Sequence, residues 1–351
     1  MTPTASRRLK TALFFMAGLF VCAGCRRLES PATQPTSRAK NQSEAGTVVT
    51  LFSDARMPFQ RAQAQYLNVL DAQDPQYALI LKDAQGYPGV QLSQMEALTA
   101  APPSALMLLP ADLTLLTEVL TQLKKAGTRI FIIDPATDIE PHSAPAEAII
   151  ACDPFKIGVT AAKLTLQALA RRAEALNRGV IEGRVLELRG SDDSPWCSRV
   201  HDGFVEGLRA QPAVLIVHDT PADWTPGLVP ARLSEAIRLQ QSIDVIFAHD
   251  DFLAQAAHET ASQSGIREDT LIIGVNGFSG NEGGLEMMRK NQIDATILRP
   301  FLVDHAWSLL SKSPSPEFAT KIAFPPKTIL PADLDHPDRL TLPLPESETT
   351  R

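Results

Sequence analysis

The sequence predicts an α/β protein made of two doubly wound parallel-sheet lobes joined by a hinge. From Thr47 onward, short apolar and β-branched runs alternate with amphipathic stretches. The runs are apolar throughout rather than at every second residue, which is typical of strands in parallel sheets that are covered on both faces. The runs are too many for one sheet of this kind to hold comfortably, so we expect two lobes.

The expected strands share a short length and a continuous apolar character. They span residues 48–51, 77–81, 105–109, 129–133, 148–151, 185–188, 214–217, 245–248, 271–275 and 295–298. The stretches between them have apolar spacings of three and four, which predict helices. In one of them Leu113, Leu116 and Leu120 share a face, and Gly127 marks the end of the helix.

The N-terminus is typical of an export signal that ends at a lipid anchor. The basic segment 7–10 precedes the apolar run 11–21, which is too short to span a bilayer comfortably. Small residues then precede Cys25 in a pattern that resembles the bacterial lipobox, so we expect lipidation of Cys25. An uncleaved anchor or an ordinary secretory signal is the alternative. Residues 26–46, rich in Ser, Thr, Pro and Gln, predict a flexible tether.

Composition excludes some classes of function. The formal net charge of -7 and the pI of about 5.6 argue against a nucleic-acid-binding protein, which needs a basic face. After Cys22 and Cys25 of the N-terminal region, only Cys152 and Cys197 remain, and the sequence leaves open whether they form a disulfide. We expect a protein of the periplasm or cell surface, anchored to the membrane through Cys25.

Polar and aromatic side chains follow the expected strands, where ligands bind in parallel α/β sheets. Phe59 and Trp224 offer flat apolar faces that suit the C–H face of a polyhydroxylated ring. Carboxylates and amides nearby suit its hydroxyl groups, because they accept and donate in the plane of the ring. This combination predicts a site for a small polar ligand between the lobes.

Several motifs occur in a characteristic order along residues 47–330. They span residues 104–112, 129–134, 186–190, 202–204, 221–224, 246–251, 273–277 and 294–297. In this order they resemble the type I periplasmic solute-binding proteins, in the ribose/galactose-binding branch that shares its fold with the effector domains of LacI-type repressors. The resemblance implies a binding protein that closes by a hinge around its ligand and performs no catalysis.

The resemblance also implies ligand-binding roles for residues at matching positions. These are Ser53, Phe59, Gln60, Asp134, Arg199, Trp224, Asp250, Asn276 and Arg299. The family usually has an amide at the position of Asp250 and a carboxylate at that of Asn276, and here the two are exchanged. Arg299 stands where a glutamine is typical, at a crossover between the lobes. Two arginines that usually hold ring hydroxyls are absent, which leaves open an anionic or substituted sugar or a ligand that is not a sugar.

We therefore expect a lipid-anchored solute-binding protein that captures a monosaccharide, sugar derivative or polyol for an ABC-type importer. One alternative is a sensory binding protein that serves a receptor or histidine kinase. The other is a lipoprotein hydrolase, whose best triad would be Ser194, His201 and Asp202. We expect no cofactor and no metal, since His249 and His258 lack a suitably spaced third ligand.

The lobes are expected to be discontinuous in sequence. Residues 1–25 form the signal and 26–46 the tether. The N-terminal lobe is expected to comprise residues 47–134 and 300–326, and the C-terminal lobe residues 135–299 and 327–345.

Overall fold

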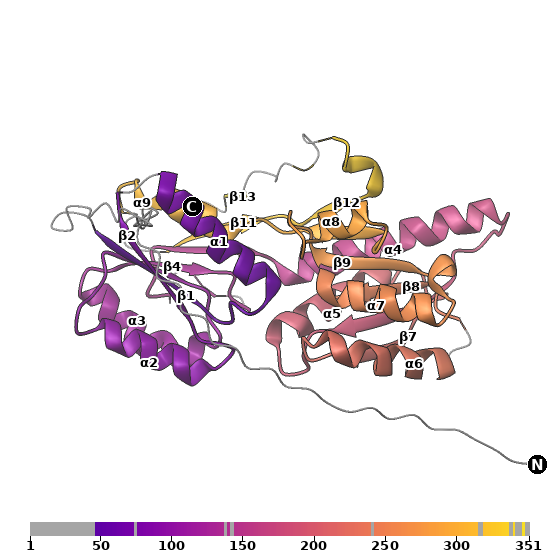
Figure 1. Ribbon diagram of the computed structural model, residues 1–351, viewed down its shortest axis with the longest axis horizontal. Coiled ribbons are helices and arrows are strands. Elements are labelled where there is room, and N and C mark those ends of the chain that lie inside the picture. The colour runs from indigo at the N-terminus through magenta and orange to yellow at the C-terminus, as the bar shows by residue number, and fades with distance from the viewer. Residues whose placement is uncertain are drawn as a thin grey trace, which may run out of the picture. The chain divides into compact units, whose positions relative to one another are not determined.

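The computed structural model describes residues 46–73, 76–136, 139–140, 144–239, 242–314, 319–336, 340 and 346–347. These residues form two α/β lobes, each with a mainly parallel sheet, so the predicted fold class is confirmed (Figure 1). The expected signal, the lipidation site at Cys25 and residues 26–45 of the expected tether lie outside the described residues.

The first lobe is built on a 7-stranded sheet with the order β13-β11-β5-β4-β3-β1-β2. Its strands are β1 (Thr47–Phe52), β2 (Ala78–Asp83), β3 (Ala105–Leu108), β4 (Arg129–Ile133), β5 (Ala148–Cys152), β11 (Thr320–Phe324) and β13 (Glu346–Ser347). Helices α1 (Pro58–Gln73) and α9 (Leu302–Leu310) bury their apolar side chains against one face, and α2 (Pro88–Leu98) and α3 (Leu113–Lys125) against the other. The pairs are parallel except β11 with β13.

The second lobe has a 6-stranded sheet with the order β12-β10-β9-β8-β6-β7. Its strands are β6 (Gly183–Arg189), β7 (Val214–Pro221), β8 (Val245–Ala248), β9 (Leu271–Asn276), β10 (Ala295–Leu298) and the antiparallel β12 (Lys327–Ile329). Helices α4 (Pro154–Ala175) and α5 (Pro195–Leu208) cover one face. Helices α6 (Val229–Leu239), α7 (Asp251–Gln263) and α8 (Gly284–Arg289) cover the other. Short 3₁₀ helices occur at Pro226–Leu228, Arg267–Asp269 and Pro331–Asp333.

The expected lobe boundary after Asp134 is wrong. Strand β5 pairs in parallel with β4 and belongs to the first sheet, so the chain first enters the second lobe at Asp153, where α4 begins. The apolar sequence of β5 is buried in the first lobe because both of its neighbours, β4 and β11, lie in that sheet. The sequence interpretation placed this strand in the second lobe, although its apolar pattern fits either sheet.

Glycines position the start of α5 by letting it pack closely against α4. A Cβ atom on Gly158 would lie 2.0 Å from the carbonyl oxygen of Val200, and one on Gly203 would lie 2.0 Å from that of Phe155. No side chain fits at these points, so the two helix backbones are in direct contact. The contact fixes the first turn of α5, which carries Trp196, at the carboxyl end of β6.

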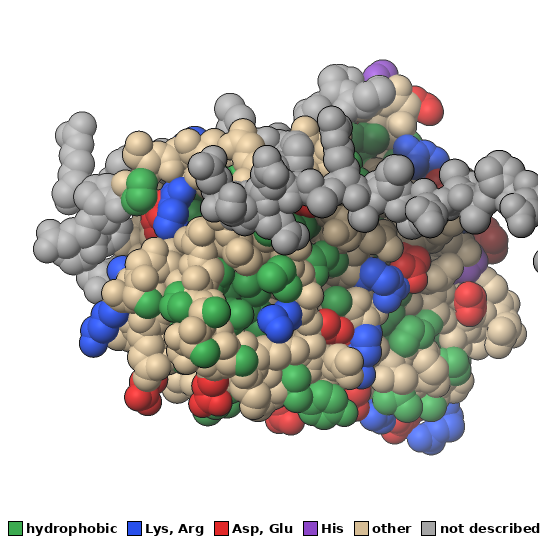
Figure 2. Space-filling view, turned by 60° about the vertical axis from the view of Figure 1, so that its left-hand side comes forward, with side chains coloured by type: hydrophobic (Ala, Val, Ile, Leu, Met, Phe, Trp, Pro, Cys, Tyr) green, Lys and Arg blue, Asp and Glu red, His purple; other side chains and the backbone are tan. Residues whose placement is uncertain are grey.

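Figure 2 shows one face of the molecule, with apolar side chains lying among charged ones. In the first lobe the exposed apolar residues include Ile80 on β2, Tyr87 before α2 and Leu115 in α3. Single exposed apolar residues of this kind are ordinary on a globular surface. Among the helices in the described part of the chain, none combines the length and the apolar character that crossing a membrane requires.

Candidate ligand-binding site

Arg299 is the centre of a hydrogen-bonded network that joins the two lobes. It follows β10, and its guanidinium donates to a carboxylate oxygen of Asp134, which follows β4 in the first lobe. It also donates to the side-chain oxygen of Asn276 at 2.9 Å, at the end of β9 in the second lobe. The amide nitrogen of Asn276 in turn donates to Asp250, which follows β8. Four of the predicted site residues therefore form one continuous chain of contacts.

Two aromatic rings flank the Arg299 guanidinium. Its central carbon lies 4.8 Å from the ring centre of Phe59, in the first turn of α1, and 5.1 Å from that of Trp196, in the first turn of α5. Stacking of this kind stabilises an arginine cation that has lost its water. Arg299 is only 6% exposed, so these contacts replace most of its hydration.

Backbone conformation at the site is unusual. Asp134, Trp224 and Asn276 adopt φ angles of 51°, 52° and 105°, in the left-handed region that residues other than glycine rarely occupy. Asp and Asn tolerate this region better than most residues, whereas a tryptophan there is uncommon. Strained conformations of this type gather at functional sites, because surrounding contacts have to hold them in place.

Burial alters the protonation of the two carboxyl groups after β8. Burial raises the pKa of Asp250 well above its ordinary value, and the neighbouring charge of Asp251 adds to this effect. Burial also raises the pKa of Asp251 to about 7, although hydrogen bonds from Thr296 and from the Gly277 backbone act against it. The Asp250 carboxyl therefore holds a proton more readily than an exposed aspartate does.

Asp250 and Asp251 have different structural tasks. Asp250 accepts a hydrogen bond from the backbone of Phe252 and so caps α7, in addition to its bond with Asn276. Asp251 is fully buried and accepts from the Gly277 backbone at 2.7 Å and from the Thr296 hydroxyl at 2.7 Å. It thereby fixes the loop that follows β9. Asp251 is the acidic residue in the first turn of α7, and Asp250 is the residue that caps the helix.

The loop after β9 makes further contacts with the first lobe. The Phe278 ring lies 6.0 Å from the Phe59 ring, centre to centre. The Glu282 carboxylate forms an ion pair with Arg61 of α1, with a shortest distance of 2.6 Å. Both contacts lie beside the Arg299 network, so residues of both lobes meet along this edge.

Other predicted site residues have different partners. Gln60, in the first turn of α1, donates to the hydroxyl of Ser53, in the loop after β1, at 2.7 Å. Arg199 lies 3.7 Å from the Asp153 carboxylate and stacks over Phe155 at 5.6 Å. These contacts hold each group near the edge of its own lobe and do not join it to the Arg299 network.

Trp224 contacts the network indirectly. A Cβ atom on Gly190 would lie 2.2 Å from the Trp224 ring, so the ring packs flat against that glycine. Its centre lies 6.1 Å from the ring of Trp196, which in turn contacts Arg299. Trp196 is the aromatic residue that sequence reasoning did not single out. The available signal was its place in the first turn of a helix after a buried strand.

A second buried cluster lies beneath Trp196. Glu187 on β6 is fully buried and binds His249 at 2.9 Å and His201 at 2.7 Å. Burial alone would raise the pKa of Glu187, but the two imidazoles outweigh it and lower the pKa to about 2. Burial would lower the pKa of His249, yet its contacts with Cys197 and Glu187 raise it to about 9. Burial would also raise the pKa of Cys197, and the nearby His249 reverses that shift and lowers it.

The residues of the candidate hydrolase triad have other partners. His201 binds Glu187, and the Ser194 hydroxyl accepts the backbone N–H of Cys197 as the cap of α5. Cys152 and Cys197 are both buried and are not paired with each other. Glu187, His201 and Asp219 place ligand atoms within 4.8 Å of one another, near enough for a metal ion. Each of them already has an ion-pair partner in the protein, Asp219 with Arg189.

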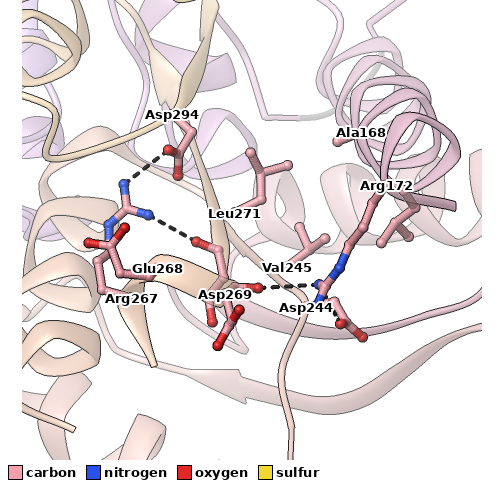
Figure 3. Close-up of a pocket in the computed structure, with 11 residues that line it drawn as sticks. Ala168, Arg172, Asp244, Val245, Arg267, Glu268, Asp269, Leu271 and Asp294 are labelled. Carbon is pink, nitrogen blue, oxygen red and sulfur yellow. Dashed lines mark hydrogen bonds and ion pairs between the residues drawn. The ribbon is translucent and has the colours of Figure 1, made fainter. Parts of the chain in front are cut away.

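A pocket of about 280 Å³ lies elsewhere in the second lobe, at the amino ends of β8 and β9 (Figure 3). Its charged side chains pair with each other: Arg172 binds Asp244 at 2.7 Å, and Arg267 binds Asp294 at 3.0 Å. Parallel sheets bind ligands at the carboxyl ends of their strands, which is the opposite edge. We therefore place the candidate site at the Arg299 network and not in this pocket.

Comparison with known proteins agrees with this architecture. Residues 49–301 match the family model described as "Periplasmic binding protein domain". The ribose import binding protein RbsB of Bacillus subtilis (strain 168) is 25% identical over 279 residues, which cover 80% of this chain and 84% of that protein.

Solved structures share the fold. The carbohydrate transporter solute-binding protein from Agrobacterium radiobacter in complex with D-arabinose has a TM-score of 0.70 at 17% identity, over 86% of this chain and 99% of that chain. The fructose-binding periplasmic domain of a hybrid two-component system has a TM-score of 0.67 at 19% identity, over 84% of this chain and 93% of that chain. Together with the family match over most of the chain and the two parallel-sheet lobes, this identifies the chain as a type I periplasmic binding protein of the ribose/galactose branch.

Proposed function

We propose that this chain is an extracytoplasmic solute-binding protein that captures a sugar or polyol between its lobes and delivers it to an ABC-type importer. The observation that carries the proposal is the network of Asp134, Arg299, Asn276 and Asp250 flanked by Phe59. It combines hydrogen-bond donors, acceptors and an aromatic face where residues of the two lobes meet. The relatives named for ribose, D-arabinose and fructose support the same ligand class.

Binding in this proposal is coupled to hinge motion. Phe59 and Asp134 belong to the first lobe and Trp196 and Asn276 to the second, so separation of the lobes would expose all four to a ligand. Only the closed form lets a ligand contact both sets at once, which gives the ligand a higher affinity for that form. Each hydrogen bond contributes only about 1 kcal/mol, but a buried group left without a partner costs more, and this difference provides specificity.

A thermal-shift screen of monosaccharides, sugar acids and polyols tests the proposal, because a ligand that binds the folded state raises its apparent stability by mass action. Calorimetry on a compound that shifts the melting temperature then gives its affinity for the wild type and for Asp250→Ala and Asn276→Ala. We expect each substitution to weaken binding at least tenfold. Lys163→Ala is the control, because Lys163 is an exposed residue of α4. Unchanged affinity in both site variants would remove the proposed site, and a screen without any stabilising compound would remove the ligand class.

We also propose that the mature protein is held at the membrane by lipid on Cys25, as the lipobox-like sequence implies. Two or more acyl chains anchor a protein stably, whereas one gives only weak binding. Cys25→Ser should move the protein from the membrane fraction to the soluble extracytoplasmic fraction. Cys22→Ser is the matched control and should leave it at the membrane. Equal distribution of wild type and Cys25→Ser would contradict the anchor.

Sensing is the second candidate, since one structural relative is the periplasmic domain of a hybrid two-component system. Deleting the gene separates the two roles. Loss of uptake of a labelled ligand that binds the purified protein supports delivery to an importer. Intact uptake together with a lost transcriptional response to the same ligand supports sensing.

A further inference from the structure

The charge of Arg299 is already neutralised inside the protein. Its guanidinium forms an ion pair with Asp134 and donates to Asn276, and the rings of Phe59 and Trp196 cover its two faces. Burial would lower the pKa of Arg299, but the nearby carboxylate of Asp134 reverses this and raises it, so Arg299 keeps its charge. An incoming ligand meets a pair with no net charge.

Two atoms of this pair have no hydrogen-bond partner in the protein. Among the described residues, the second carboxylate oxygen of Asp134 and the Nε atom of Arg299 are buried and have no hydrogen-bond partner. Asp134 therefore offers an acceptor and Arg299 a donor on the same pair. A hydroxyl group both donates and accepts, so it matches this arrangement. A carboxylate could accept from Arg299 but would face Asp134 with a second negative charge.

The other arginines near the predicted site do not supply a spare cation. The Arg56 guanidinium pairs with Asp54 at 2.8 Å, and Arg199 lies 3.7 Å from Asp153. Arg299 is thus the buried cation of the site, and Asp134 is its counter-ion.

We propose that Asp134 determines the charge specificity of this site: by pairing with Arg299, it makes the site accept uncharged hydroxylated ligands and reject their acids. This inference rests on the proposed function and decides one of its open questions, since arginines near the site also fit an anionic sugar. The Asp134 carboxylate would repel the carboxylate of an acidic ligand. Burial of that unpaired ligand charge would also cost free energy, so the site disfavours the acid.

The test compares neutral, acidic and amino forms of the same sugars. The probes are D-glucose, D-galactose, D-ribose and D-arabinose, their uronic or aldonic acids, and D-glucosamine and D-galactosamine, each measured by calorimetry at pH 7. The variants are Asp134→Asn and Arg299→Gln. Asparagine suits position 134 because it tolerates the left-handed backbone found there, with φ of 51°. Asp244→Asn is the matched control, because it removes a carboxylate that pairs with an arginine, Arg172, at the opposite edge of the second sheet.

For the wild type we expect at least tenfold tighter binding of a neutral sugar than of its acid. Asp134→Asn should reduce this preference at least tenfold or reverse it, and Asp244→Asn should leave it unchanged. Arg299→Gln should shift the preference toward the amino sugar, because the Asp134 carboxylate is then unpaired. This second variant tests the inference even if Asp134→Asn does not fold. An acid that binds the wild type as tightly as its neutral form, or variants that keep the wild-type preference, would overturn the inference and leave the proposed function standing. A wild type that binds none of these probes would also overturn the inference, whereas the proposed function falls only if the broader thermal-shift screen finds no ligand.

Discussion

The buried cluster around Glu187 makes the stability of this protein depend on pH in a defined direction. Contacts with Cys197 and Glu187 raise the pKa of His249 in the folded state to about 9, against an ordinary value of 6.5. A raised pKa means that the folded state holds its proton more tightly than the unfolded chain does. The resulting stabilisation is complete below pH 6.5 and is lost as the pH rises through about 9.

The size of the pKa shift of His249 determines how much the free energy of unfolding changes with pH. One unit of pKa corresponds to about 1.4 kcal/mol, so the His249 shift contributes on the order of 3 kcal/mol to the free energy of unfolding. His249 is fully buried, so solvent screening does not reduce this contribution. The lowered pKa of Cys197 acts in the opposite sense, because its contribution appears only as the pH rises. The raised pKa of His201, which also contacts Glu187, acts in the same sense as that of His249 and opposes the effect of Cys197.

Urea unfolding followed by tryptophan fluorescence, repeated from pH 6 to pH 10, measures this loss. Glu187→Gln removes the carboxylate that helps to hold the charge on His249, so the variant should be less stable than the wild type at pH 6, by about 3 kcal/mol. The difference should shrink as the pH rises toward 10. Glu206→Gln is the control, because Glu206 also lies on this lobe but pairs with Arg209 at the exposed surface. Parallel pH profiles for wild type and Glu187→Gln would refute the reasoning.

Three further predictions follow from individual contacts. Trp196→Ala should weaken sugar binding more than Trp224→Ala in calorimetry, because Trp196 contacts Arg299 directly and Trp224 only through Trp196; the reverse order would contradict this arrangement. Gly203→Ala should lower the free energy of unfolding in urea by about 1–3 kcal/mol, since the new methyl group overlaps a backbone carbonyl of α4. Gly227→Ala, where a Cβ atom meets nothing within 4 Å, should change it little, and equal effects would be inconsistent with close helix packing. Glu282→Gln should cost less than about 1 kcal/mol in the same assay, because its ion pair with Arg61 is exposed, and a larger loss would show that this pair holds the lobes together.

The sequence pattern located the strands because a strand that is buried on both faces has a continuous apolar sequence. The apolar runs correspond to β1 through β10, and helices lie between most of them. The short strands β11 and β12 were not expected, since Thr320–Phe324 and Lys327–Ile329 flank two prolines and include lysines. Their place in the sheets depends on neighbours that are distant in sequence.

Ligands bind at the carboxyl ends of parallel strands, and this rule together with the family resemblance predicted five residues that contact one another in the structure. They are Phe59, Asp134, Asp250, Asn276 and Arg299. The sequence did not predict the hydrogen-bond and ion-pair partners of the individual site residues. Ser53 binds Gln60 and Arg199 lies beside Asp153, although position alone had put them in the same set as Arg299.

By itself, the sequence determined the α/β class, the two lobes and the edge at which polar side chains gather, because each of these follows from residues close together in the chain. Only the tertiary structure decided that β5 belongs to the first lobe, that Trp196 stacks on Arg299, and that Glu187 holds two histidines. These features depend on which distant elements become neighbours when the two sheets form. A local sequence pattern does not determine those neighbours.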